Sequence, residues 1–417
     1  MSTQQHIRFI TRKASHICLT ILIAACCGAA LAQAPAPAQI QAKAKVQYHV
    51  SNLDTLGGTN SAGNSINDQS WVAGYSRLTG DQARHATLWR NGSTAEDLGT
   101  LAGPNNTLNS NVTWNVKNTA GIIVGISQTA TPEPNGEHWS SAAFYGGAFG
   151  FINLGFVWEQ GQMRGLPNFP GGNNGFATGA NNLGQVVGWA ENGVHDPTCC
   201  CTQVLQFRPA MWSLGPPADQ IHDLPLIPGD TSGAATAIND NGQIVGISGI
   251  CDQAVGRHTA RHAVLWENGT VTDIYPDAPA PWWNTPTAIN QQGDVVGFAG
   301  DPAFVEGDIL HAFIWTKDNG IKALKPLRGR VPQHVDSEAY GINERRQVVG
   351  VSCDADGVDC RAVIWDHGVY PTDLNDFKGG YSARLETAKD INNLGEITGR
   401  AIDSTGVRTA YKAVPVQ

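Results

Sequence analysis

Charged side chains are scarce in this chain. Of its 417 residues only 15% are Asp, Glu, Lys or Arg, and the formal net charge is −9. The sequence has no run of lysine or arginine, so it lacks the basic patch expected of a protein that binds nucleic acid or an anionic membrane. After the first 32 residues no apolar run is long enough to span a bilayer. We therefore expect no nucleic-acid partner and no membrane span.

The short motifs of common catalytic sites are also missing. The sequence contains no GxSxG elbow, no HExxH helix and no phosphate-binding P-loop. A glycosidase needs only two carboxylates roughly 5–10 Å apart, and a sequence cannot show such a pair. We assign no catalytic residue, and an enzyme stays open as an alternative.

The first residues have the pattern of an export signal. Arg8, Arg12 and Lys13 precede an apolar stretch from Ile17 to Leu31. This stretch is too short for an ordinary membrane span and has the length of a signal-peptide core. We predict a signal peptide over residues 1–32, which places the mature protein outside the cytoplasm, secreted, periplasmic or on the cell surface.

A lipid anchor is the alternative to soluble export. The segment Ile23-Ala24-Ala25-Cys26 resembles a lipobox, which would leave a lipid-bearing Cys26. The apolar stretch continues beyond this cysteine, which favours soluble export. A linker rich in Ala, Pro and Gln follows over residues 33–45.

Six cysteines lie beyond the predicted signal peptide. They are Cys199, Cys200, Cys201, Cys251, Cys353 and Cys360. An even number in an exported chain favours disulfides. We predict that Cys353 pairs with Cys360, and that Cys251 pairs with one of the three consecutive cysteines. Zinc is the weaker interpretation, because no two cysteines have CxxC spacing.

One phrase recurs seven times along the rest of the chain. Its clearest copy is Ala-Ile-Asn-Asp-Asn-Gly-Gln-Ile-Val-Gly at Ala237–Gly246. The glycines that end the seven copies are Gly74, Gly125, Gly188, Gly246, Gly297, Gly350 and Gly399. A repeat of roughly 50 residues is the size of one propeller blade and too long for a turn of most solenoids.

The phrase predicts a β-hairpin. Asn followed by Gly three residues later is typical of a tight type I turn, and the β-branched residues after it form a returning strand. Ser70 and Arg346 replace the turn glycine in two copies, so we expect looser turns there. The second copy is degenerate, with one extra residue and Lys117 in place of the Asn.

A second phrase follows each first one and ends in tryptophan. Its copies are His85–Trp89, Arg208–Trp212, His262–Trp266, His311–Trp315 and Arg361–Trp365. Each predicts a strand that turns back at a nearby glycine, and two hairpins make a four-stranded blade. The tryptophans should pack between blades. The three histidines occupy equivalent places in different blades, so they cannot converge on one metal ion.

Together the two phrases predict an all-β fold over residues 46–417, a seven-bladed β-propeller of four-stranded antiparallel blades. The last repeat lacks its return strand, and the start of the mature chain supplies a matching one. We expect residues 50–56 to pair with residues 408–414, so that the two ends share one blade and close the ring. An open solenoid is the structural alternative.

The segment 126–176 is irregular. Two candidates for its tryptophan-type strand stand there, Ala143–Tyr145 and Phe156–Trp158, and the sequence does not decide between them.

The repeated phrases resemble the HAF family of probable extracellular repeats, named after a His-Ala-Phe tripeptide that stands here at His311-Ala312-Phe313. The resemblance covers about residues 48–414. It implies export and a repeat fold. It implies no defined activity and no catalytic residues.

Loops that vary between repeats are the places to look for a binding site. Their unusual residues are aromatic or charged, as in sites that stack on sugar rings or hold a peptide. The candidate ligand-binding residues are Tyr275, Trp282, Trp283, Arg328, Arg330, His334, Asp336, Phe377 and Tyr381. The competing interpretation is that the paired tryptophans only pack in the fold.

A short acidic loop lies between Cys353 and Cys360. Its carboxylates, Asp354, Asp356 and Asp359, are of the type that binds calcium, although the loop is shorter than an EF-hand and lacks its final Glu. Calcium is the one cofactor considered; a solvated, disulfide-linked hairpin tip is the alternative.

Three functions remain in view. The first is an exported, non-catalytic scaffold that binds an extracellular glycan or protein through its variable loops. The second is an extracellular carbohydrate-active hydrolase or lyase with acidic residues over the central channel. The third is a structural protein of the cell envelope. A carboxylate pair whose pKa values diverge would favour the enzyme.

Overall fold

A computed structural model describes most of the repeat region. It covers residues 46–90, 92–103, 106–147, 150–199, 203–216, 219–251, 259–279, 282–301 and 309–416. Residues 45–417 form one compact unit. The predicted signal peptide, the linker and the lipobox cysteine Cys26 lie outside the described residues. No helix in the described part is long and apolar enough to cross a membrane.

The structure is built from short antiparallel strands in groups of four. The first strand of each group precedes the Asn turn and carries small or β-branched residues. These strands are β2 (Gly57–Ile66), β6 (Ser110–Asn111), β10 (Gly175–Ala180), β14 (Ser232–Ile238), β18 (Trp283–Ile289), β22 (His334–Ile342) and β26 (Arg384–Ile391).

The second strand of each group returns from the Asn turn. These strands are β3 (Val72–Leu78), β7 (Ile123–Pro132), β11 (Gln185–His195), β15 (Ile244–Gly249), β19 (Val295–Asp301), β23 (Gln347–Asp354) and β27 (Ile397–Ile402). The third carries the tryptophan phrase or its equivalent. These strands are β4 (Arg84–Trp89), β8 (Phe151–Glu159), β12 (Leu205–Ser213), β16 (His262–Glu267), β20 (Ile309–Thr316), β24 (Arg361–Asp366) and β28 (Arg408–Val416).

The fourth strand is short and lies at the outside of its group. These strands are β5 (Glu96–Asp97), β9 (Gln162–Gly165), β13 (Gln220–Asp223), β17 (Thr270–Asp273), β21 (Gly320–Ala323) and β25 (Thr372–Asp373), and for the last group β1 (Gln47–Asn52). Two short helices complete the described structure, α1 (Trp139–Tyr145) and the 3₁₀ turn η1 (Leu374–Phe377).

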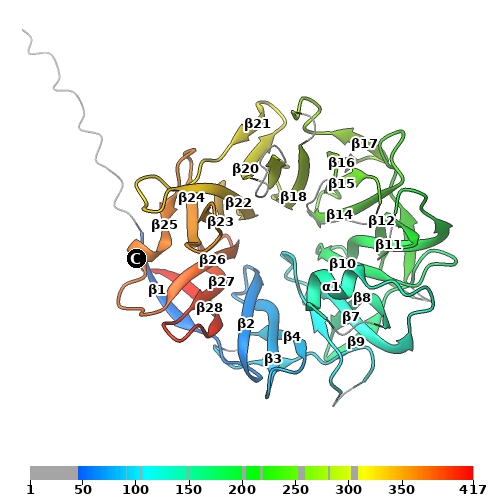
Figure 1. Cartoon of the computed structure of the whole chain (residues 1–417), viewed down its shortest axis with the longest axis horizontal. Helices are drawn as coiled ribbons and strands as arrows, with labels where there is room; N and C mark the ends of the chain where they lie inside the picture. Colours follow the sequence, from blue (N-terminus) through cyan, green and yellow to red (C-terminus); the bar gives the residue numbers. More distant parts are fainter. Residues whose placement is uncertain are drawn as a thin grey trace, which may run out of the picture. The chain divides into compact units, whose positions relative to one another are not determined.

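Five of these groups are separate four-stranded antiparallel sheets, from β6–β9 to β22–β25. The other two, β2–β5 and β26–β28 with β1, are joined into one mixed sheet by a single parallel bridge between Asn60 and Arg408. The sheets follow one another about a common centre, with the labelled first strands nearest to it (Figure 1). The chain therefore has an all-β, β-propeller-like fold.

The two ends of the repeat region are paired. β1 runs antiparallel to β28, with Gln47 opposite Val416 and Asn52 opposite Tyr411. Tyr48 and Val50 are buried against Tyr411 in one apolar cluster. The predicted contact between the ends is present, but the strand begins three residues nearer the N-terminus than expected and ends at Asn52.

The Asn turns without glycine are not looser than the others, which corrects the expectation for Ser70 and Arg346. Both residues adopt positive φ, 64° and 57°, and both close the turn with a 3.0 Å hydrogen bond to the carbonyl of the turn Asn. The left-handed conformation costs roughly 1–2 kcal/mol for a residue with a Cβ. Each side chain makes an offsetting bond to the neighbouring sheet: Ser70 donates to Glu396 at 2.6 Å, and Arg346 to Asp294 at 2.6 Å.

The irregular segment contains a helix that the sequence did not predict. Ala143–Tyr145 lies in α1, whereas Phe156–Trp158 lies in β8 and is the regular strand of its sheet. Phe144 and Tyr145 pack with Phe176 in an apolar cluster. The insertion is thus held by aromatic burial rather than by the repeat pattern.

The repeated tryptophans pack between neighbouring sheets, as predicted. Trp89, Trp212 and Trp365 are fully buried. The indole of Trp89 donates to the carbonyl of Asp54, and Trp212, Trp266 and Trp365 make the same kind of bond to the segment that leads into the first strand of their own sheet. Trp315 departs from this pattern, because it is only partly buried.

Both predicted disulfides are present. Cys353 bonds Cys360, and Cys251 bonds Cys199. The other two consecutive cysteines, 200 and 201, lie outside the described residues. Disulfides form in oxidising compartments, so this pairing agrees with an extracytoplasmic protein.

Candidate functional site

The Asn of the repeated phrase links each sheet to the next. Asn239 accepts hydrogen bonds from the backbone of its own turn, and its Nδ2 donates to the carbonyl of Asn290 at 2.9 Å. The same link to the next turn starts from Asn67, Asn181, Asn290, Asn343 and Asn392. The recurrence of Asn is therefore structural and marks no ligand site.

The turns surround a cavity of about 220 Å³. Its rim consists of the residue after each turn Asn: Asp68, Thr119, Asn182, Asp240, Gln291, Glu344 and Asn393. Most of these also bond one another, as Asn393 does to Asp68 at 2.7 and 2.8 Å. The rim carboxylates thus already accept hydrogen bonds. Among the described residues no group of three or more acidic, His or Cys side chains is placed to bind a metal ion.

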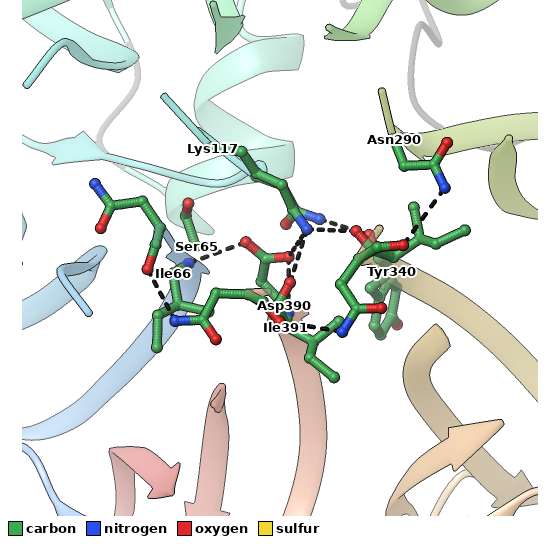
Figure 2. Close-up of polar contacts among 12 residues, drawn as sticks. Ser65, Ile66, Lys117, Asn290, Tyr340, Asp390 and Ile391 are labelled. Atoms are coloured by element: carbon green, nitrogen blue, oxygen red, sulfur yellow. Dashed lines mark hydrogen bonds and ion pairs between the residues drawn. The ribbon is translucent and has the colours of Figure 1, made fainter. Parts of the chain in front are cut away.

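Lys117 spans the space between three sheets (Figure 2). Its Nζ lies 2.9 Å from Oδ1 of Asp390 and donates to the carbonyls of Ile342 and Ile391 at 2.5 and 2.8 Å. The Asp390 carboxylate has no exposed side-chain surface, and its Oδ2 accepts from the backbone of Ile66 at 2.9 Å. Burial raises the pKa of Asp390, and Lys117 opposes that shift.

This geometry corrects the alignment of the second repeat. Lys117 does not replace the turn Asn; Asn118 does that, since its Oδ1 accepts from Ile122 and its Nδ2 donates to the carbonyl of Ala180. Lys117 stands where other copies have the apolar residue before the Asn. Because this copy has one extra residue, the sequence alone did not show that Asn118 is equivalent to the turn Asn of the other copies.

A bulge recurs in the first strands, three residues before the turn Asn. The register shifts at this position in six of the seven strand groups, and the bulged residues are Asn64, Thr178, Thr236, Thr287, Tyr340 and Lys389. The short polar ones bond backbone carbonyls, as Thr287 does to Ala339 at 2.8 Å and Asn64 does to Val112 at 2.7 Å. Tyr340 and Lys389 are too large for that role.

These two large side chains form a polar group with Glu338. The Nζ of Lys389 lies 3.4 Å from the centre of the Tyr340 ring, and the Tyr340 hydroxyl donates to Glu338 at 2.8 Å. Burial raises the pKa of Glu338 and lowers that of Lys389 to about 8, although Glu338 itself favours the charged lysine. Burial also raises the pKa of Tyr340.

Glu386, a carboxylate on the neighbouring first strand β26, has its pKa shifted in the opposite direction to that of Glu338. Glu386 lies 2.7 Å from Arg400 and 3.3 Å from Arg408. Although burial acts to raise its pKa, the two arginines lower it overall. Glu338 and Glu386 therefore have pKa values that are shifted apart.

Three of the predicted binding residues share one open cleft of about 450 Å³, named here the Arg328 cleft. It is lined by Lys325, Pro326, Leu327, Arg328, Gly329, Arg330, Gln333, His334 and Tyr370. The Arg328 guanidinium lies 3.3 Å from the centre of the exposed Tyr370 ring. Arg330 is paired with Asp373. Within the described residues no carboxylate pairs with Lys325 or Arg328.

Two further predicted residues lie outside the cleft lining: Trp282 directly precedes β18, and Asp336 lies in β22. The half-buried Trp282 stacks on His311, with ring centres 4.9 Å apart and planes at 6°. Burial lowers the pKa of His311, Asp301 opposes this shift, and the charge of Lys325 adds to it. Asp336 accepts a hydrogen bond from the backbone of Leu310 at 2.9 Å.

The other predicted binding residues make packing contacts. Trp283 is buried and meets Phe298 edge-on. Tyr275 packs beside Phe313. Phe377 and Tyr381 are packed against the apolar cluster of the last sheet. The fold distributes these residues over several sheets, so they do not form one site.

The acidic loop is organised by cations. Both oxygens of Asp359 have partners: Oδ1 lies 2.8 Å from Arg361 and 2.9 Å from Arg384, and Oδ2 lies 3.3 Å from the His334 ring. Oδ1 of Asp354 accepts from the backbone of Val358 and Asp359. Asp356 is exposed. A calcium ion here would have to displace the arginines from Asp359.

Sequence reasoning missed Lys325 and Tyr370 of the cleft and the whole Glu338–Tyr340–Lys389 group. A usable signal existed for the latter. The other described bulges carry Thr or Asn three residues before the turn Asn, so Tyr340 and Lys389 are departures at a fixed position of the repeat.

No protein-family model matches this chain, and none of the curated proteins does. Several solved structures are similar at low identity. The β-propeller domain of the trilobed protease from Pyrococcus furiosus is 12% identical, with a TM-score of 0.44, over 78% of this chain and 84% of that one. A PL25 ulvan lyase is 9% identical, with a TM-score of 0.45, over 87% and 93%. A gluconolactonase from Xanthomonas campestris is 9% identical, with a TM-score of 0.36, over 89% and 95%. Likenesses this weak give no information about activity.

Proposed function

We propose that this protein is an exported binding module, a closed seven-bladed β-propeller of the HAF-repeat type, which binds an anionic extracellular glycan in the Arg328 cleft. The observation that carries the proposal is the cleft itself. It places two cations, for which the described part of the chain supplies no carboxylate partner, beside an exposed aromatic ring.

The charge of the cleft selects the class of ligand. The whole chain is acidic, with a formal charge of −9, yet Lys325 and Arg328 stand together at this surface. Arg binds carboxylates and sulfates through paired N–H groups, and a tyrosine ring offers a flat face to a sugar. A glycan that carries uronate or sulfate groups satisfies both features better than a neutral glycan.

The proposal also explains the disulfides and the first residues. Two disulfides suit a protein that works outside the cytoplasm. A signal peptide over residues 1–32 would take it there. The seven first strands and the pairing of β1 with β28 support the closed ring.

A glycan and peptide array on the purified mature protein, with and without calcium, tests the proposal. Acidic glycans should be retained and their neutral counterparts should not. Arg328→Ala and Tyr370→Ala should each weaken binding about tenfold, because a charge-assisted contact or a stacking face is lost. Lys317→Ala, in an exposed turn, is the control. Retention of peptides only, or unchanged binding by both cleft variants, would refute the proposal.

One observation favours a second candidate, a carbohydrate-active enzyme. Glu338 and Glu386 line neighbouring first strands and have pKa values shifted in opposite directions, as in a pair that divides the roles of acid and base. This candidate predicts release of reducing ends from an acidic polysaccharide, and loss of that release in Glu338→Gln. Binding without turnover would exclude it.

A further inference from the structure

Lys389 differs from the other lysine of the central region. Lys117 is held by three oxygens. Lys389 lies over the Tyr340 ring, and within the described residues no oxygen is within hydrogen-bonding distance of its Nζ. A half-buried ammonium group without an acceptor is costly for a fold, because it loses part of its hydration and receives no bond in return.

The repeat shows that the fold does not require a lysine here. At the same bulge other sheets carry a short Thr or Asn that bonds a backbone carbonyl, as Thr236 does to Val245 at 3.1 Å. Bulges are frequent beside functional sites, where they redirect a side chain. The lysine at this position makes no such bond to the described residues, which points to a partner from outside the fold.

The charges around Lys389 favour an anion. The groups that face it are Glu338 and Tyr340 from β22, Glu386 from its own strand and Arg400 from β27. Glu386 is already shared by Arg400 and Arg408. The hydroxyl of Tyr340 is bonded to Glu338, whose raised pKa disfavours its charged form. Three cations, Lys389, Arg400 and Arg408, thus stand against two carboxylates, Glu338 and Glu386.

We propose that Lys389 is the anion-binding residue of a second ligand site, in which a carboxylate of a small ligand accepts a hydrogen bond from Nζ above the Tyr340 ring. The site does not depend on the Arg328 cleft, which belongs to the preceding sheet junction. Burial lowers the pKa of Lys389 despite the opposing charges of Glu338 and Glu386, and a carboxylate bound directly to Nζ should raise it again.

Calorimetric titration of the mature protein tests the site with three probes. Galacturonate and succinate carry carboxylates, and galactose does not. We expect one or both carboxylates to bind, with Lys389→Met at least about tenfold weaker and Lys389→Arg within about threefold of the parent protein. Lys317→Met, in an exposed turn, is the matched control and should leave affinity unchanged. Binding of galacturonate alone would identify a uronic sugar as ligand, and binding of both would identify any small carboxylate.

The pH dependence gives a second readout. Affinity should fall between pH 7 and pH 9.5, since the ammonium group loses its proton around pH 8, and Lys389→Arg should abolish that fall. The proposal is overturned if Lys389→Met binds as the parent does, if galactose binds as well as galacturonate, or if no carboxylate binds at about 10 mM. Loss of binding in Arg328→Ala instead would place the anion in the cleft. Thermal melting of each variant verifies that it is folded.

Discussion

At the scale of single residues, Lys117 stabilises the fold by neutralising a buried carboxylate. Asp390 has no exposed side-chain surface and comes from a sheet that is far from Lys117 in sequence. Removing one member of a buried ion pair leaves the other charge without compensation, which costs about 3–5 kcal/mol. The pair therefore connects distant parts of the chain more strongly than a surface salt bridge would.

Lys117→Met should lower the free energy of unfolding by about 3 kcal/mol, measured by urea denaturation. Adding Asp390→Asn should restore part of the loss, because the amide needs no counter-ion. If the single and double variants are equally destabilised, the charge of Asp390 is not the cause.

Glu191 is a second buried carboxylate, and it makes stability depend on pH. It is fully buried, accepts hydrogen bonds from Asn174 and Gln203, and lies near Glu137, which also accepts from Gln203. Burial, with the charge of Glu137 adding to it, raises the pKa of Glu191 to about 7. The folded state therefore holds this proton more tightly than the unfolded state does.

A raised carboxyl pKa stabilises the protein below the unfolded value, and the contribution is lost as pH rises toward the folded value. The melting temperature should fall between pH 5 and pH 8, by an amount equivalent to about 2–3 kcal/mol. In Glu191→Gln this dependence should flatten, since the amide does not ionise. An equally steep fall in the variant would assign the effect to other groups.

At the scale of elements, the Asn hairpin is the unit from which the molecule is built. One side chain holds its own turn closed and donates to the next turn, so local folding and the joining of neighbouring sheets use the same residue. Asn239 makes these bonds from a buried position, whereas Asn241, two residues later, is exposed.

Asn239→Ala should therefore cost about 2 kcal/mol, because two backbone donors and one carbonyl lose their partner in a buried place. Asn241→Ala removes one exposed bond, to the carbonyl of Gln291, and should cost about 0.5 kcal/mol. Chemical denaturation of the two variants gives the comparison. Equal losses would mean that the link between turns adds no stability.

At the scale of the whole molecule, the pairing of β1 with β28 completes the last sheet. Val50 faces the apolar cluster of that sheet, while His49 beside it is exposed. The alternation is that of an outer strand with one buried face. If this strand holds the two ends of the repeat region together, a substitution on its buried face should destabilise the entire fold.

Val50→Asp should lower stability by about 3 kcal/mol, because it buries an unpaired charge, and His49→Asp by less than about 0.5 kcal/mol. Differential scanning calorimetry should show one transition that moves in the first variant only. A small separate transition would mean that the last sheet unfolds by itself.

Much of this architecture could be predicted from the sequence because the strands and turns of each repeat follow from short local sequence patterns. The Asn turn, the β-branched return strand and the tryptophan strand are each determined by residues a few positions apart. Because these patterns recur, a wrong prediction from one copy of the repeat can be corrected by comparison with the others. The same locality identified both disulfides, including the short loop between Cys353 and Cys360. Where the repeat is interrupted, as at α1 and around Lys117, that redundancy was lost and the predictions failed.

The sequence by itself determined the strand order and the kind of sheet, since hydrogen-bonded hairpins follow from local turn chemistry. Only the tertiary structure decided which polar side chains meet. Lys117 and Asp390, or Tyr340 and Lys389, come from different repeats, and their contacts depend on how the sheets are arranged about the centre and on bulges that redirect a side chain. For the same reason only three of the nine residues expected to bind a ligand share one cleft, where Arg328 has Lys325 and Tyr370 as further neighbours.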